Sequence, residues 1–198
     1  MASKERVNPQ INYSKIEDVQ GVKKVSGISK QSDDVPQIKE VQYGKHIIKG
    51  KNGKKKLLSN SKYATEVGYN YKTGSLGRIK NVEVDKLEYG AAKRNPYAQR
   101  SVGGSDRLPT DDGGHLIASQ FRGSGDIDNL LPQSKNINRS GGDWYSMEQE
   151  WANTIKDNKS VRNVQIDIGY PGNSKRPDMF KVSYNIDGKL PIRRIKNE

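Results

Sequence analysis

Four stretches of the chain alternate apolar and polar residues, as strands with one buried face do. Residues 66–71 and residues 78–84 alternate on either side of a turn at 72–75. Two alternating stretches joined by a glycine-containing turn predict a β-hairpin. The alternation returns at residues 162–168 and at residues 179–186. We therefore expect an antiparallel sheet built largely from these four stretches.

One main amphipathic helix is expected between the two strand pairs. Four large apolar residues recur there at spacings of three, four and four: Trp144, Met147, Trp151 and Ile155. This spacing places them on one helix face, and Asp143 is a suitable N-cap. A shorter helix is expected within residues 91–99, broken at Pro96, and residues 101–114 have the composition of a loop. Because strand signals outnumber helix signals, the predicted fold class is α+β.

The first part of the chain has a different character. Residues 1–56 are rich in lysine, hold few large apolar residues and contain neither Trp nor Phe. Such a segment buries too little surface to offset the entropy that is lost on ordering. We therefore expect a basic, flexible linker or partner-dependent segment at 1–56 and a folded domain at 57–198. Within the first segment, His46 is not expected to have a chemical role.

The net charge points to a polyanionic partner. The chain has 35 Lys and Arg residues against 23 Asp and Glu residues, which gives a formal net charge of +12. This balance favours nucleic acid as a partner, although a lysine-rich surface that serves solubility alone has the same composition. The absence of cysteine excludes disulfides, thiolate metal sites and a cysteine nucleophile. No stretch is apolar enough to span a membrane, so membrane insertion is not expected.

Candidates for acid–base catalysis are few, because the chain has two histidines. His115 follows the run Asp111-Asp112-Gly113-Gly114, whose two glycines free the backbone directly before the imidazole. An imidazole titrates near neutral pH and can serve as a general base. A structural histidine that bonds a neighbouring carbonyl is an equally good interpretation of this residue taken alone.

Two further groups are suited to a metal-dependent reaction. Residues 128–139 are crowded with amides, whose oxygens are neutral ligands for Mg²⁺ but are also common in turns. Glu148 falls at the edge of the buried face of the predicted helix, between Trp144 and Trp151. A carboxylate placed there needs a partner, which would be a metal-bound water or a basic side chain.

These residues form three blocks that resemble the DNA/RNA non-specific endonuclease family of His-Me-finger (ββα-metal) nucleases. The blocks are Asp112-Gly113-Gly114-His115, Asn129-x-x-Pro132-Gln133-x4-Asn138 and Trp144-x3-Glu148. The family pattern is Asp-Arg-Gly-His, Asn-x-x-Pro-Gln-x4-Asn and Trp-x3-Glu, and the resemblance extends over residues 63–190. The branch most similar to this chain comprises C-terminal nuclease toxin domains of polymorphic bacterial effectors, including those with an LXG-type export domain.

The chain departs from the family pattern at two places. Gly113 stands where the family has arginine, so the phosphate contact of that side chain has to come from another residue. The additional pair Gly141-Gly142 precedes Trp144, which leaves Asn136 as an alternative to Asn138. Five arginines are candidates for contacts with substrate phosphates: Arg78, Arg94, Arg100, Arg122 and Arg139.

The resemblance implies a role for each matching residue. His115 would deprotonate the attacking water, and Asn138 would bind one Mg²⁺ ion, with Mn²⁺ as a substitute. Glu148 would hold a metal-bound water and so complete the metal site. Asn129 would orient His115 or hold the local loop, and Asp112 would brace the turn or the metal waters.

The resemblance also implies a function, namely Mg²⁺-dependent hydrolysis of phosphodiester bonds in DNA, with RNA as the other candidate substrate. Such a domain would be the toxin of a secreted antibacterial effector of the LXG and type VII secretion kind, delivered into a target cell. An acidic immunity protein would hold it inactive in the cytoplasm of the producing cell. The alternative is a module of the same fold that binds nucleic acid without cleaving it.

Overall fold

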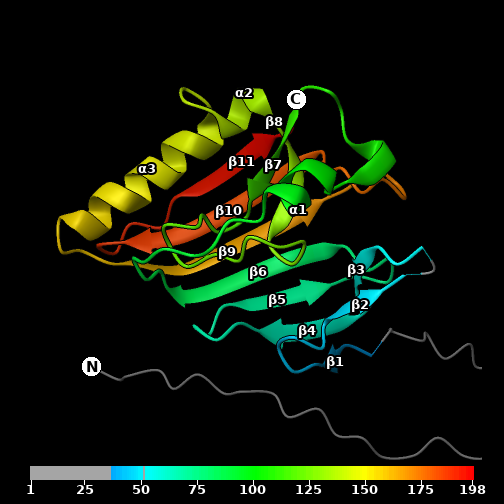
Figure 1. Ribbon diagram of the computed structural model, residues 1–198. Coiled ribbons are helices and arrows are strands. Elements are labelled where there is room, and N and C mark those ends of the chain that lie inside the picture. Colours follow the sequence, from blue (N-terminus) through cyan, green and yellow to red (C-terminus); the bar gives the residue numbers. More distant parts are fainter. Residues whose placement is uncertain (1–36, 51) are drawn as a thin grey trace, which may run out of the picture. The chain divides into compact units, whose positions relative to one another are not determined.

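The computed structural model describes residues 37–50 and 52–198, which form one compact unit. Seven strands form the main sheet in the spatial order β1–β4–β5–β6–β9–β10–β11 (Figure 1). Their bounds are Lys39–Glu40 (β1), Ser61–Ala64 (β4), Asn70–Thr73 (β5), Ile79–Lys86 (β6), Val161–Gly169 (β9), Met179–Ile186 (β10) and Ile192–Lys196 (β11). Neighbours pair antiparallel except β1 and β4, which pair in parallel. The predicted antiparallel sheet and the α+β class are confirmed.

Two short hairpins accompany the main sheet. One consists of β2 (Ile47–Lys49) and β3 (Lys55–Leu57), and the other of β7 (Asp111–His115) and β8 (Leu130–Ser134). The prediction of a loop up to residue 114 was wrong at its end, since β7 lies there. Its glycine-rich sequence has little strand propensity, and the strand is formed by pairing with the buried β8.

The helices are α1 (Pro96–Ser101), the 3₁₀ helix η1 (Gly104–Asp106), α2 (Lys135–Asn138) and α3 (Asp143–Lys156). Pro96 begins α1 instead of breaking a helix, because a proline at the first position loses no helical hydrogen bond. The N-cap of α3 is Gly142, and Asp143 lies in the first turn. Helices of the described residues are too short or too polar to cross a membrane.

One part of the core lies between the main sheet and α3. Trp144 of α3 packs on Phe180 of β10, with ring centroids 4.9 Å apart. Trp151 meets Tyr184 of β10 edge to face at 5.3 Å and Phe121 at 6.2 Å. These side chains are fully buried. The apolar face read from the sequence is therefore the face that fixes α3 to the sheet.

The described part of the predicted linker belongs to the fold. Residues 37–50 and 52–56 supply β1, β2 and most of β3, and residues 1–36 and 51 lie outside the described residues. His46 is 1% exposed, and its ring stacks on that of Tyr63 at 3.9 Å. The boundary predicted at residue 57 is therefore too late. Lysine-rich composition concealed these strands, because their lysines are mostly exposed while His46 and Leu57 point inward.

Candidate active site

Two strands and a helix come together around His115. β7 and β8 pair with His115 opposite Leu130 and Asp112 opposite Gln133. α2 follows β8 directly, and α3 begins a few residues later. This strand–strand–helix order is the ββα core that the sequence resemblance implies.

A cavity of about 340 Å³ opens between β7, α1, α3 and the loop that follows His115. Four of the predicted functional residues line it: Arg94, His115, Asn138 and Glu148. They come from positions up to 54 residues apart in sequence, and the fold brings them to one place. A convergence of polar and ionisable side chains in one cavity is typical of an active site.

The imidazole of His115 has an unsatisfied nitrogen. Its Nε2 is buried and has no hydrogen-bond partner among the described residues. Burial, followed by the nearby charge of Arg94, lowers the pKa of His115 to about 4. The imidazole is therefore neutral at pH 7 and able to accept a proton.

Glu148 faces the same cavity in a poorly solvated position. Its Oε1 accepts a hydrogen bond from Trp144 Nε1 at 3.2 Å. Burial raises the pKa of Glu148 to about 7, against the opposing effects of this hydrogen bond and of Arg94. A nearby cation would stabilise the ionised carboxylate, so the environment favours a metal ion or a metal-bound water.

Asn138 is held by a chain of polar contacts. Its Nδ2 donates to Asp112 Oδ2 at 3.1 Å, which leaves the amide oxygen as the atom available to a ligand. Arg139 donates to both oxygens of Asp112, at 2.9 and 2.8 Å, and these hydrogen bonds lower the pKa of Asp112. Asp112 therefore stays ionised and fixes the orientation of Asn138.

The additional glycines explain why Asn138 and not Asn136 reaches the cavity. A Cβ on Gly142 would lie 2.3 Å from the carbonyl oxygens of Asn136 and Ile137. Only glycine lets α3 begin against the end of α2, and this places Asn138 beside the cavity while Asn136 is exposed.

Asn129 is fully buried and holds the loop. Its Oδ1 accepts from Tyr71 Oη at 2.8 Å and from the Ile117 N–H at 2.9 Å. Its Nδ2 donates to the carbonyls of Ile117 and Ser124 at 2.9 and 2.7 Å. All four hydrogen-bonding positions of the amide are thus used. Of the two roles implied for Asn129, these contacts fit the holding of the loop.

The five candidate arginines have different surroundings. Among them, Arg94 is the one that lines the cavity, where its Nε lies 3.4 Å from Ser119 Oγ. Arg139 is engaged with Asp112 at the cavity edge. Arg100 is exposed on α1, next to the cavity residue Gln99.

The other two arginines, Arg78 and Arg122, do not line the cavity. Arg78 Nη1 donates to the carbonyl of Gly172 at 2.9 Å, and its guanidinium lies 4.4 Å from the ring centroid of Tyr170. Arg122 faces Glu88, with 3.8 Å between Nη1 and Oε2. Arg78 therefore braces a loop, and neither contact brings the side chain toward the cavity.

Comparison with known proteins agrees with this geometry. The DNA/RNA non-specific endonuclease family matches residues 59–188, a range that includes β7, β8, α3 and the whole cavity. The chain belongs to the DNA/RNA non-specific endonuclease family. It is therefore a nuclease domain built on the ββα core.

Individual relatives of this endonuclease domain are also found. The type VII secretion system protein EssD of Staphylococcus aureus strains USA300 and NCTC 8325 is 49% identical over 166 residues. These residues make up 82% of this chain and 27% of EssD, so the chain spans about a quarter of the curated relatives it matches. A solved structure of Sda1 nuclease with bound zinc shares 24% identity, with a TM-score of 0.40 over 45% of this chain and 39% of that one.

The donor set of the cavity fits a hard divalent cation. Nuclease activity in this family implies such an ion, and the cavity offers the free amide oxygen of Asn138 and the poorly solvated carboxylate of Glu148. Among the described residues there is no cluster of three or more His, Cys, Asp or Glu side chains. Oxygen donors that are few in number suit Mg²⁺, which keeps most of its water ligands.

The close approach of α1 explains why this endonuclease has Gly113 where the family pattern has arginine. A Cβ on Gly113 would lie 2.1 Å from the carbonyl oxygen of Gln99 in α1. Position 113 therefore accepts no side chain while α1 lies there. Arg94 precedes α1 by two residues and brings a guanidinium to the same cavity.

Several cavity residues of this endonuclease were not identified from the sequence. They are Gln99, Ser119, Gln120, Tyr145 and Gln149. Tyr145 and Gln149 could have been inferred, because Tyr145 lies three residues before Glu148 on α3 and Gln149 lies four residues after Tyr145. The other three depend on how α1 and the loop after His115 fold back, and no local pattern shows this.

Proposed function

We propose that this cavity is the active site of a Mg²⁺-dependent endonuclease that hydrolyses DNA, with Mn²⁺ as a substitute metal. One observation carries the proposal: the family-matched residues His115, Asn138 and Glu148 line a single cavity together with Arg94. RNA is the second polymer to test. A site that activates water attacks the phosphodiester without using the 2′-position, so the same chemistry applies to either polymer.

His115 is assigned the general base. Its neutral imidazole takes a proton from water as the water oxygen forms its bond to phosphorus. The bond between phosphorus and the 3′-oxygen breaks, and the leaving oxygen takes a proton from solvent. An incoming phosphodiester brings negative charge beside Arg94, which reduces one cause of the lowered pKa and makes His115 a stronger base.

Arg94 is assigned the phosphate contact. It is the one cation among the described residues that line the cavity, and arginine suits the oxygens of a phosphate because its donors form a planar fork. Charge that develops on the phosphate in the transition state is stabilised by a donor that is already in place. The guanidinium is presented by a backbone that pairs with the loop at Gly125.

Asn138 and Glu148 are assigned the metal site. The Asn138 amide oxygen would bind the ion directly, and Glu148 would accept a hydrogen bond from a metal-bound water. When bound, Mg²⁺ supplies positive charge that stabilises the phosphate and the leaving oxygen. Asp112 serves this site by holding Asn138.

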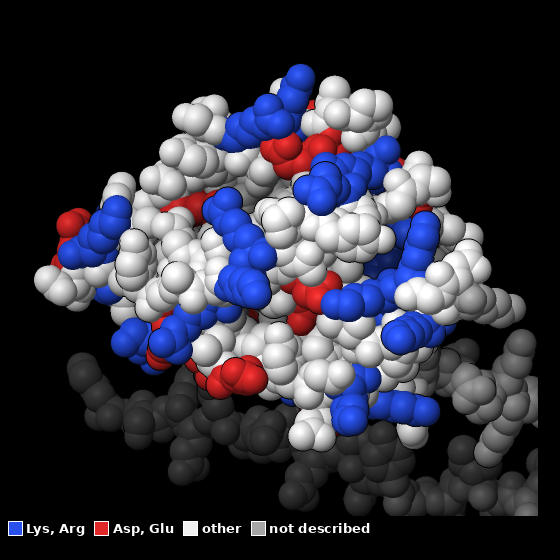
Figure 2. Space-filling model, in the orientation of Figure 1, with Lys and Arg blue, Asp and Glu red and all other residues white. Residues whose placement is uncertain are grey.

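The substrate contact is expected to be dominated by charge. Figure 2 shows Lys and Arg side chains spread across the face of the molecule seen in Figure 1, with acidic side chains between them. Contacts with phosphates are independent of base sequence and weaken steeply with salt. Cleavage is therefore expected to fall strongly between about 50 and 200 mM salt, whereas cleavage indifferent to salt would contradict a phosphate-dominated contact.

We further propose that the domain is the toxin part of a secreted antibacterial effector. The 49% identity to the type VII secretion system protein EssD supports this setting. In it, an acidic immunity protein binds the basic surface in the producing cell, with association favoured by opposite charges. The measurement is co-purification of the domain with the product of a neighbouring gene that encodes an acidic protein.

A supercoiled-plasmid nicking assay tests the catalytic proposal. The expected result is nicking with Mg²⁺ or Mn²⁺ and none with EDTA. Cleavage of a single-stranded RNA under the same conditions shows whether RNA is also a substrate. Nicking that persists in EDTA would contradict the metal-dependent mechanism, and intact plasmid with folded protein and metal would contradict nuclease activity on DNA.

A further inference from the structure

His46 makes a buried contact with the loop that forms the wall of the active-site cavity. Its Nε2 lies 3.0 Å from Asp128 Oδ2, and its Nδ1 accepts a hydrogen bond from the Gly44 N–H at 3.1 Å. Because Nδ1 accepts, the ring proton is on Nε2 and is donated to Asp128. His46 and Asp128 are 1% and 2% exposed, so the carboxylate depends on protein donors in place of water.

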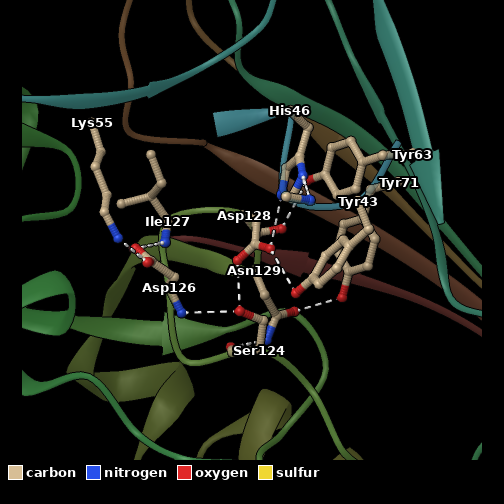
Figure 3. A network of polar contacts seen from close by, with 11 residues as sticks. Tyr43, His46, Lys55, Tyr63, Tyr71, Ser124, Asp126, Ile127, Asp128 and Asn129 are labelled. Carbon is tan, nitrogen blue, oxygen red and sulfur yellow. Dashed lines mark hydrogen bonds and ion pairs between the residues drawn. The ribbon is translucent and has the colours of Figure 1, made fainter. Parts of the chain in front are cut away.

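Asp128 is surrounded by donors from several segments, which Figure 3 shows converging on it. Tyr43 Oη donates to Oδ2 at 3.3 Å and Ser124 Oγ donates to Oδ1 at 2.7 Å. Tyr63 Oη donates to the backbone carbonyl at 3.0 Å. The ring of His46 also stacks on the rings of Tyr43 and Tyr63, which fixes its plane.

The contacts continue from Asp128 to the residues that directly follow His115 at the end of β7. Asn129, the next residue, binds Ile117 through both atoms of its amide, and its carbonyl accepts from the Leu116 N–H at 2.8 Å. Leu116 and Ile117 directly follow His115. A displacement of Asp128 would therefore be passed to the backbone at His115 and to the cavity wall at 118–120.

A second contact joins the same two regions. Lys55 of β3 forms an ion pair with Asp126, two residues before Asp128 (Figure 3). Both contacts start from residues before position 59, where the family match begins. The segment that makes them, residues 43–50 and 52–55, is called the strap below.

We propose that the strap positions the loop between β7 and β8, and that His46 is a positioning residue for catalysis through Asp128. The proposal rests on the proposed nuclease function. His46 is uncharged in this arrangement, so its loss leaves the phosphate-binding surface unchanged. Its loss is instead expected to let the His115 backbone and the cavity wall shift.

The test compares His46→Ala with His46→Gln in the full chain, well below the melting temperature of each variant. His46→Ala is expected to lower kcat by about 10–100-fold, the range for a catalytic group displaced by about 1 Å. KM and DNA affinity are expected to stay close to wild type. His46→Gln, whose amide can still donate to Asp128, is expected to recover most of the lost kcat. Lys49→Ala, an exposed position of the strap, is the control.

Each outcome decides the proposal. Wild-type kcat in folded His46→Ala would overturn it, and so would a loss that glutamine does not restore and that follows the melting temperature alone. If His46→Ala does not fold, Tyr43→Phe removes one donor to Asp128, and unchanged kcat in that variant would overturn the proposal. Absence of cleavage by the wild-type chain would instead overturn the nuclease function on which the proposal rests.

Discussion

The two histidines of the chain lie in opposite kinds of polar environment. Both ring nitrogens of His46 have partners, the Gly44 N–H and Asp128. His115 has a buried Nε2 without a partner among the described residues. A buried polar atom without a partner costs free energy, and a role in binding or reaction is one reason for which it is retained. His115 combines such an atom with a place in the cavity, whereas the contacts of His46 hold it in the fold.

The same difference extends to the regions around the two histidines. Asn129 uses all four hydrogen-bonding positions of its amide, whereas Glu148 has a single donor and a pKa raised to about 7 by burial. Polar groups in the cavity therefore have few hydrogen-bond partners, whereas those of the buried network around Asn129 have all of theirs. Variants in the cavity should therefore lose cleavage and keep stability, whereas variants in the network should lose stability and affect cleavage only as far as they displace the loop between β7 and β8.

Apart from loss of the general base His115, the largest effect among the cavity variants is expected for Arg94→Ala. Loss of the guanidinium removes a preorganised donor to the phosphate, which typically costs about 100-fold in rate. The melting temperature should stay near that of wild type, because Arg94 is exposed and its one side-chain contact is weak. Single-turnover cleavage of plasmid DNA measures the rate. Arg122→Ala is the matched control, and an equal loss in both variants would remove Arg94 from the site.

Asn138→Ala is expected to reduce cleavage by at least about tenfold at a fixed Mg²⁺ concentration, because a direct ligand is lost. More Mg²⁺ should recover part of the rate, since the defect is in metal binding. A titration of cleavage rate against Mg²⁺ measures this for Asn138→Ala and for the exposed Asn136→Ala. Identical titrations would show that neither amide binds the metal.

Glu148 should give the wild-type enzyme a pH dependence of about tenfold between pH 6 and pH 8 at low Mg²⁺. With its pKa raised to about 7, the carboxyl is mostly protonated at pH 6 and ionised at pH 8. Added Mg²⁺ should move this rise to lower pH, because a cation favours the carboxylate. Glu148→Gln should lack the rise. A rate that is flat from pH 6 to 8 in wild type would contradict the assignment.

The same group should affect the stability of the metal-free protein in a defined direction. A raised folded-state pKa means that the folded chain binds the proton more tightly than the unfolded chain. The stabilisation is therefore present below about pH 4.5 and is lost as pH rises through about 7. Melting temperatures in EDTA should fall across this window more in wild type than in Glu148→Gln.

Tyr71→Phe probes the buried network around Asn129 and should have the smallest effect on cleavage. It removes the hydrogen bond to Asn129 Oδ1 but leaves the one from the Ile117 N–H. The free energy of unfolding is expected to fall by about 1–2 kcal/mol, and the rate by a few-fold at most. Chemical denaturation measures the free energy of unfolding, and plasmid cleavage measures the rate. A rate loss as large as that of Arg94→Ala without a stability loss would break the distinction between the two regions.

Local periodicity explains which parts of the fold could be predicted. The strands β6, β9 and β10 and the helix α3 were predicted because their alternation or helical spacing is complete within a few residues. The first strand of the predicted hairpin was misplaced, since β5 begins four residues after residue 66 and takes up two residues of the predicted turn at 72–75. β7 was hidden by its glycines. The strap was not predicted because its composition is rich in lysine. The contact that buries His46 is also distant in sequence, since its partner Asp128 lies 82 residues further along the chain.

The site was predictable in its motif residues but not in their surroundings. The spacing of the three blocks led to His115, Asn138 and Glu148, and the structure places all three in the cavity. Arg94 could be chosen among the five arginines only once the position of α1 was known. In α1, the backbone of Gln99 lies directly against Gly113. That contact joins residues whose proximity no sequence pattern reveals.

The most direct test of this account is His115→Ala, measured for cleavage, DNA binding and thermal stability in the same buffer. Loss of a general base predicts a rate reduced by at least about 100-fold. DNA affinity and melting temperature should remain close to those of wild type, because the imidazole is neutral and its buried nitrogen has no partner to lose. Wild-type cleavage by the variant would contradict the account, as would a rate loss explained by unfolding.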